Sequence, residues 1–216
     1  MTNRDFFAKI YNMIINWYGE GCFKVQTSGI TILTDPFGSE SGLTPPRFKA
    51  EIVLKTLTSL PISPVVNEEA IQIAGPGEYE FKGVEFFGRP LNKESNKELI
   101  KTVYSVRAEE MNLCFLGHIS HALEPAVLEK LADVDLLFLP TGGKPFVDQE
   151  TAAKIIKQIE PKMVIASFFK TPGLKRKTDD IKEFLKELEQ KSEPQEKLTV
   201  KKKDLSEKME VVVLKV

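Results

Sequence analysis

The sequence predicts an α/β protein in which β-sheets are covered by helices within a single layered domain. Short β-rich runs separated by glycine turns fill the first half of the chain, which is the spacing of antiparallel hairpins. In the second half, apolar strand-like runs alternate with segments of helical periodicity. With 216 residues, 42% of them hydrophobic, the chain is long enough to bury a substantial core.

Each predicted strand of the first half is a short run with turn residues at its ends. Gly75, Pro76 and Gly77 mark a tight connection between two of these runs. The predicted strands are IINWYG (14–19), CFKVQT (22–27), ITILTD (30–35), EIVLKTL (51–57), AIQIAG (70–75), YEFKG (79–83) and VEFFG (84–88).

The second half predicts a hairpin, then buried strands joined by helices. TVYSVRA (102–108) and MNLCFLG (111–117) form the hairpin, and DLLFLP (135–140) and KMVIASF (162–168) are apolar enough for strands buried on both faces. KLTVKK (197–202) and MEVVVLKV (209–216) close the chain as strands.

Three helices are expected between these strands. One covers residues 124–134, with Pro125 in its first turn. A second begins after Asp148, a good N-cap residue, and ends before Pro161. A third is capped by Thr178 and carries an apolar stripe of Ile181, Phe184, Leu185 and Leu188.

Composition argues against several classes of protein. Lys plus Arg number 30 and Asp plus Glu 31, so the basic excess typical of nucleic-acid binding is absent. No stretch approaches the roughly 20 apolar residues of a membrane-spanning helix, and the charged N-terminus is unlike a secretory signal. Cys22 and Cys114 lie in apolar runs and are expected to be buried free thiols. These features predict a cytoplasmic protein without membrane contact.

The order of several motifs resembles metallo-β-lactamase-fold hydrolases, in particular the branch of L-ascorbate-6-phosphate lactonase and related uncharacterised Zn-dependent hydrolases. The motifs are INWYGEGCFKVQTSGITILTDPFGSESGL, KAEIVLKTL, IAGPGEYEFKGVEFFG, NLCFLGHISHAL, VDLLFLPTGG and PKMVIASFFKTPG. The resemblance covers about residues 13–216 and implies one domain with a four-layer αββα sandwich. Residues 1–12 fall outside it and are expected to be an N-terminal extension.

The same resemblance implies a site for one or two zinc ions, yet the residues at its positions have changed. The His-x-His-x-Asp-His motif of the family aligns with Leu57, Ser59, Pro61 and Ile62. The bridging Asp aligns with His118, the terminal His with Phe168, and the early Gly-His with Gly19-Glu20. Asp35 of the TDPF segment is retained, at a position with a supporting role in the family.

A catalytic zinc takes about three protein ligands and one open position for water. We therefore expect no cofactor, no catalytic residues, and a non-catalytic binding or structural protein that retains the fold. An alternative is a lactonase- or phosphodiesterase-like hydrolase with a relocated zinc site. The only two histidines, His118 and His121, would form it, with Asp35 and Glu78 as further candidate ligands.

Other residues predict binding surfaces. Gly142 and Gly143 could expose backbone N–H groups to an anion beside Lys144, which makes this loop the candidate ligand pocket. The basic runs 170–177 and 201–203 have acidic neighbours and are interpreted as solvated loops, so nucleic-acid binding is the least favoured alternative. The expected partner is an unknown small molecule or protein, and a homo-oligomer is compatible with an exposed edge strand.

Overall fold

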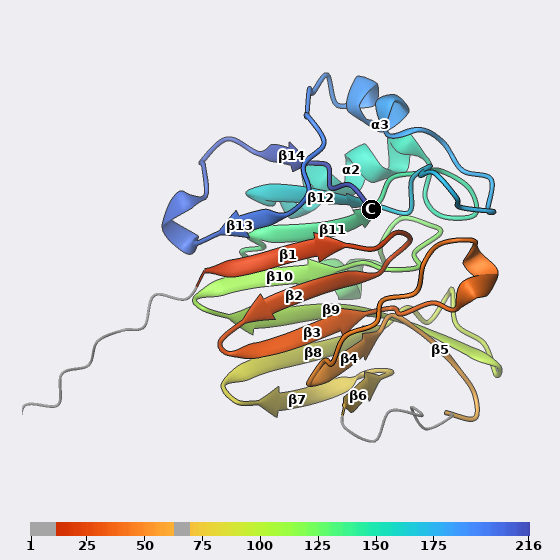
Figure 1. Cartoon of the computed structure of the whole chain (residues 1–216), viewed down its shortest axis with the longest axis vertical. Coiled ribbons are helices and arrows are strands. Elements are labelled where there is room, and N and C mark those ends of the chain that lie inside the picture. Colours follow the sequence, from red (N-terminus) through yellow and green to blue (C-terminus); the bar gives the residue numbers. More distant parts are fainter. Residues whose placement is uncertain (1–11, 63–69) are drawn as a thin grey trace, which may run out of the picture.

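Two β-sheets pack face to face in the computed structural model, which describes residues 12–62 and 70–216 (Figure 1). Of the expected N-terminal extension, residues 1–11 lie outside the described part. The core between the sheets draws on both: Ile15, Phe23 and Ile32 from the first meet Phe86, Phe138 and Ile165 from the second. One shared core of this kind agrees with the predicted layered α/β architecture.

The first sheet contains six strands and is built mainly from the N-terminal third of the chain. Its strands β1, β2 and β3 are antiparallel neighbours, whereas β4 and β6 run parallel to β3. In spatial order the strands are β13 (Leu198–Val200), β1 (Met13–Trp17), β2 (Phe23–Thr27), β3 (Ile30–Thr34), β4 (Ile52–Lys55) and β6 (Ile71–Ala74).

The second sheet contains eight strands and combines an antiparallel part with a parallel part. The predicted hairpin is present as β9 and β10. Strand β10 pairs in parallel with β11, which pairs in parallel with β12. Every residue of β11 and β12 is buried. The order is β14 (Glu210–Val212), β12 (Met163–Ser167), β11 (Leu136–Pro140), β10 (Met111–Phe115), β9 (Leu99–Ala108), β8 (Val84–Pro90) and β7 (Gly77–Phe81), with β5 (Leu57–Ser59) paired to β9.

Helices cover the outer face of the second sheet. Helix α2 (Gln149–Ile159) and helix α3 (Ile181–Glu187) pack over Leu137 and Val164. The predicted start of α2 is confirmed, because the Asp148 carboxylate accepts a hydrogen bond from Thr151 N at 2.8 Å.

Two helix predictions were wrong in detail. Helix α1 (Pro125–Leu128) is one turn long, far shorter than 124–134, because the chain continues in turns after Leu128 and Asp133 has a positive φ of 52°. The N-cap of α3 is Asp180, since Thr178 turns away and donates its hydroxyl hydrogen to the carbonyl oxygens of Gly142 and Phe168.

The outer face of the first sheet is covered differently. The connection 36–50 folds over Cys22 and Leu33 and brings Phe37 and Phe48 against them. It contains the short 3-10 helix η1 (Ser39–Ser41), and a second one, η2 (Lys202–Asp204), precedes β14. Glycines and prolines in 36–50 prevent a longer helix, so the fourth layer is reduced to this loop within the described residues.

Candidate functional site

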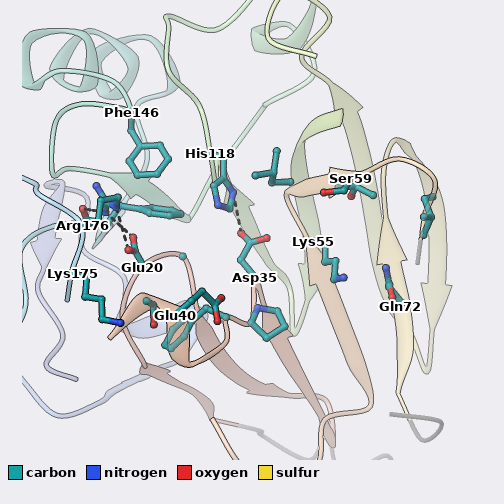
Figure 2. Close-up of a pocket in the computed structure, with 18 residues that line it drawn as sticks. Glu20, Asp35, Glu40, Lys55, Ser59, Gln72, His118, Phe146, Lys175 and Arg176 are labelled. Atoms are coloured by element: carbon teal, nitrogen blue, oxygen red, sulfur yellow. Dashed lines mark hydrogen bonds and ion pairs between the residues drawn. The ribbon is translucent and has the colours of Figure 1, made fainter. Parts of the chain in front are cut away.

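A cleft of about 750 Å³ opens where several parallel strands end (Figure 2). Asp35 follows β3, His118 follows β10 and Phe168 follows β12, so three carboxyl ends of strands meet there. Such an edge is the usual place for a ligand in an α/β fold. Its lining also includes Leu57, Ser59 and Ile62, so most positions that align with the family's zinc ligands lie in one cleft.

His118 is held in the wall of this cleft by Thr56 and Asp35. Its Nδ1 atom lies 2.8 Å from Thr56 Oγ1 and 3.8 Å from Asp35 Oδ2. The Thr56 hydroxyl donates to Asp35 Oδ2 at 2.6 Å, and Thr56 N donates to Asp35 Oδ1 at 2.7 Å. With the single hydroxyl hydrogen directed to an ionised Asp35, Nδ1 is the donor to Thr56 and Nε2 is an acceptor.

Burial shifts the pKa values of Asp35 and His118. It raises the pKa of Asp35, an effect that the nearby His118 and the hydrogen bonds from Thr56 only partly offset. It lowers the pKa of His118 against the opposing attraction of Asp35. His118 is therefore an uncharged imidazole at neutral pH.

Opposite His118, an ion pair joins two loops that are distant in the sequence. Arg176 Nη2 lies 2.7 Å from Glu20 Oε2, and Arg176 Nε lies 3.2 Å from Glu20 Oε1. Nη2 also donates to the carbonyl oxygen of Phe168 at 2.9 Å, and the guanidinium lies 4.9 Å from the ring centre of Phe146. The two charged side chains are only 16% and 23% exposed, so this is a bidentate pair largely shielded from water.

The backbone of the cleft is unusual. Glu20, Asp35 and Phe168 all have positive φ, at 50°, 36° and 58°. A non-glycine residue in this region costs free energy, and such residues gather at functional sites. The loop before His118 is equally constrained, because Gly117 has φ of 55° and a methyl group there would overlap Thr56.

Two of the four candidate metal ligands lie apart from the other two. His121 is 78% exposed and its Nδ1 lies 3.6 Å from Glu94, so its side chain has different partners from His118. Glu78 is on the exposed strand β7 and pairs with Arg89. Only Asp35 and His118 line the cleft.

Glu94 explains the position of His121. Its carboxylate accepts hydrogen bonds from Lys101 Nζ at 2.7 Å, from Ser120 N at 2.8 Å and from His121 N at 3.1 Å. The side chain of Glu94 is 6% exposed. The buried carboxylate of Glu94 thus holds the loop after His118, and His121 contributes to this contact with its backbone N–H.

The predicted pocket loop contributes to the cleft through a different residue. Gly142, Gly143 and Lys144 are not among the residues that line it, whereas Phe146 is. Gly142 packs so closely on Phe168 and Thr178 that a side chain would overlap them, and its carbonyl oxygen accepts from Thr178. Its backbone therefore closes the loop onto the strand end.

Sequence reasoning missed the cations of the cleft. Lys175 and Arg176 belong to the basic run that was interpreted as a solvated loop, and Lys55 ends β4. Gln72 on β6 also lines the cleft, and both polar atoms of its amide are buried without a hydrogen-bond partner. The position of Arg176 eight residues after Phe168 was a weak signal, because loop length does not reveal where a side chain points.

An α/β sandwich with a cleft at its strand ends is the architecture of metallo-β-lactamase-fold proteins. Residues 14–167 match the family described as the β-lactamase superfamily domain. The chain belongs to this family, which confirms the resemblance seen in the sequence.

Relatives and solved structures agree with this assignment. A UPF0173 metal-dependent hydrolase of Bacillus thuringiensis subsp. konkukian is 24% identical over 74% of this chain and 86% of its own. A Thermotoga maritima structure, assigned as a Zn-dependent hydrolase of the metallo-β-lactamase superfamily, has a TM-score of 0.78 at 27% identity, covering 94% of this chain and all of that one. Igni18, a metallo hydrolase of Ignicoccus hospitalis, shares the fold, with a TM-score of 0.61 at 14% identity over 88% of this chain and 99% of its own.

The residues that the structure describes in the cleft do not form the ligand set of the zinc site that this family implies. Zinc requires about three converging ligands from His, Cys, Asp or Glu. Across residues 12–62 and 70–216, no group of three or more such side chains is arranged to hold a metal ion. Glu20 is occupied by Arg176, and both oxygens of Asp35 accept hydrogen bonds from Thr56.

The part of the chain that the structure describes also contains no helix of the length and apolarity needed to cross a membrane. Both cysteines are buried and free, as predicted, and burial raises the pKa of each thiol.

Proposed function

We propose that this chain is a non-catalytic member of the superfamily, in which the cleft binds a small molecule without metal-dependent hydrolysis. The observation that carries the proposal is the bidentate pair between Glu20 and Arg176 at the strand ends. A guanidinium fixed beside the Glu20 carboxylate repels a divalent cation there and occupies the oxygens that would bind it.

The aromatic and apolar side chains support the same function. Phe168 stands at the position of the family's terminal histidine and is buried, with its ring 5.0 Å from that of His118. Leu57 and Ile62 stand at positions of the main zinc motif and line the cleft. Without a metal-bound water of lowered pKa, the hydrolysis that the family performs has no nucleophile at neutral pH.

The cleft nevertheless retains the properties of a binding site. Its volume of about 750 Å³ lies within the range of small-molecule pockets. Glu20, Asp35 and Phe168, which all line the cleft, have positive φ, a costly conformation that gathers at functional sites. This backbone geometry supports ligand binding.

Metal content tests the proposal directly. The protein is purified without chelator, and zinc, iron and manganese are measured by elemental analysis beside the Bacillus thuringiensis relative prepared in the same way. We expect substoichiometric metal and an unchanged melting temperature after EDTA treatment. Stoichiometric metal that is lost on His118→Ala would overturn the proposal.

A second candidate function rests on His118 and Asp35, which do lie together in the cleft. In that case the chain would be a metal-dependent hydrolase, as the names of its relatives state. The same measurement separates the two, because this candidate requires bound metal that depends on both residues.

A further inference from the structure

Most carboxylates of the cleft have hydrogen-bond or ion-pair partners, whereas two of its lysines have none among the residues that the structure describes. Among its carboxylates, Glu20 is paired with Arg176, and Asp35 turns both oxygens to Thr56. The side chains of Lys55 and Lys175 have no ion pair or hydrogen bond within residues 12–62 and 70–216. Glu40 alone remains as an exposed carboxylate, and it accepts from the backbone N–H of Gly38.

A second observation comes from buried donors that lack partners. Arg176 Nη1 is buried without a hydrogen-bond partner, although the other nitrogens that face Glu20 are used. An unpaired buried donor on a charged group costs free energy, so the pair with Glu20 leaves part of the guanidinium without a partner. Lys175 is the neighbouring residue and also lines the cleft, so two cationic groups lie at this end (Figure 2).

The remainder of the cleft offers apolar surface. Leu57 is half-buried and Ile62 is 51% exposed, and both line the cavity with Phe37. The ring of His118 lies beside those of Phe146 and Phe168. A ligand with a flat or apolar body would gain from covering these side chains, because their exposed area is removed from water.

We infer that the cleft takes a small organic anion, with its carboxylate or phosphate group at Lys175 and Arg176 and its apolar body against Leu57 and Ile62. This inference rests on the proposed function and names the ligand class of the same cleft. The two sources of negative charge share one chemistry, namely oxygens that accept hydrogen bonds from cations.

Binding of four probes of one shape tests it. Benzoate and phenyl phosphate carry the anion, benzyl alcohol is neutral and benzylamine is a cation; each is titrated by calorimetry and by NMR shifts. We expect saturable binding of at least one anion in the millimolar range or tighter, and weaker or no binding of the other two. Equal or tighter binding of benzylamine, or no saturable binding of either anion, would overturn the inference.

Single-residue variants test where in the cleft the anion binds. Lys175→Met is expected to weaken anion binding about twofold to fivefold, because one exposed charged contact is lost. Lys177→Met makes the same chemical change two residues away, outside the cleft lining, and is expected to leave binding unchanged. An effect confined to Lys55→Met, or equal effects of Lys175→Met and Lys177→Met, would contradict the assigned position.

Metal content measured on the same preparation keeps the two proposals separate. Anion binding in a metal-free protein supports both. Absence of anion binding in a metal-free protein overturns only the ligand class. Anion binding that disappears with EDTA, from a protein that contains metal, overturns both the proposed function and the cationic anchor.

Discussion

The ion pair between Glu20 and Arg176 joins the β1–β2 loop to the loop after β12, and its strength can be measured by a double-mutant cycle. Two charge-assisted hydrogen bonds connect the side chains, at 2.7 Å and 3.2 Å. Each such bond contributes about 1.5–3 kcal/mol when shielded from water. Because both side chains keep some exposure, 16% and 23%, we expect a coupling energy of about 2 kcal/mol in total.

The loss of unfolding free energy in each single variant depends on which polar groups remain without a partner. Arg176→Met leaves the Glu20 carboxylate without its partner and removes the bond to Phe168 O, so we expect a loss of about 3 kcal/mol. Glu20→Gln keeps an acceptor and is expected to cost about 1.5 kcal/mol. The double variant then costs about 2.5 kcal/mol, less than the sum of the singles.

Urea unfolding gives these energies. The single tryptophan, Trp17, reports on the region, since its Nε1 donates to the carbonyl oxygen of Glu20 at 2.9 Å. Circular dichroism checks that unfolding is two-state, and Arg176→Met should lower the melting temperature by about 9 °C. A coupling below about 0.5 kcal/mol would refute the reasoning, as would equal costs of Arg176→Met and the control Lys177→Met.

Two further predictions concern the loop after β10. Burial tends to raise the pKa of Glu94, but hydrogen bonds from Lys101 and Ser120 outweigh it and lower the pKa below its ordinary value. Its folded state therefore binds fewer protons than the unfolded one, so the stabilisation is present above the unfolded pKa and is lost as pH falls. Glu94→Gln should cost about 2 kcal/mol at neutral pH and progressively less in acid, whereas the exposed control Glu98→Gln should cost little at any pH; a pH-independent loss in urea titrations would argue against this. His118→Ala should cost about 1–2 kcal/mol because it loses the bond to Thr56, and His121→Ala less than about 0.5 kcal/mol; similar losses for both in thermal unfolding would contradict the separate environments.

The sequence predicted the layered fold because its signals are local. The all-buried strands β11 and β12 appear as continuous apolar runs, and the Asp148 cap marks the start of α2. The predicted helix over 124–134 was wrong in length: Val127, Leu131 and Val134 are buried, but apolar spacing does not show that the chain leaves the helix after Leu128. The cap Thr178 was wrong because its hydroxyl finds tertiary acceptors in Gly142 and Phe168.

The candidate site was only partly accessible from the sequence. The family resemblance indicated which positions face the site, and Leu57, Ser59, Ile62, His118 and Phe168 do line one cleft. It also indicated Glu20 and Asp35, but not the cations Lys55, Lys175 and Arg176 that lie with them in the cleft.

By itself, then, the sequence determined where most strands lie along the chain and, through the family resemblance, which side chains stand at the expected zinc-ligand positions, since both depend on residue identity and local spacing. The tertiary structure alone decided the partners. Glu20 and Arg176 are separated by 156 positions and meet only because two strand ends converge, while the side chains of His118 and His121, three positions apart, lie beside different carboxylates, Asp35 and Glu94. Electrostatic and hydrogen-bond energies depend on distances in space, which a linear pattern does not contain.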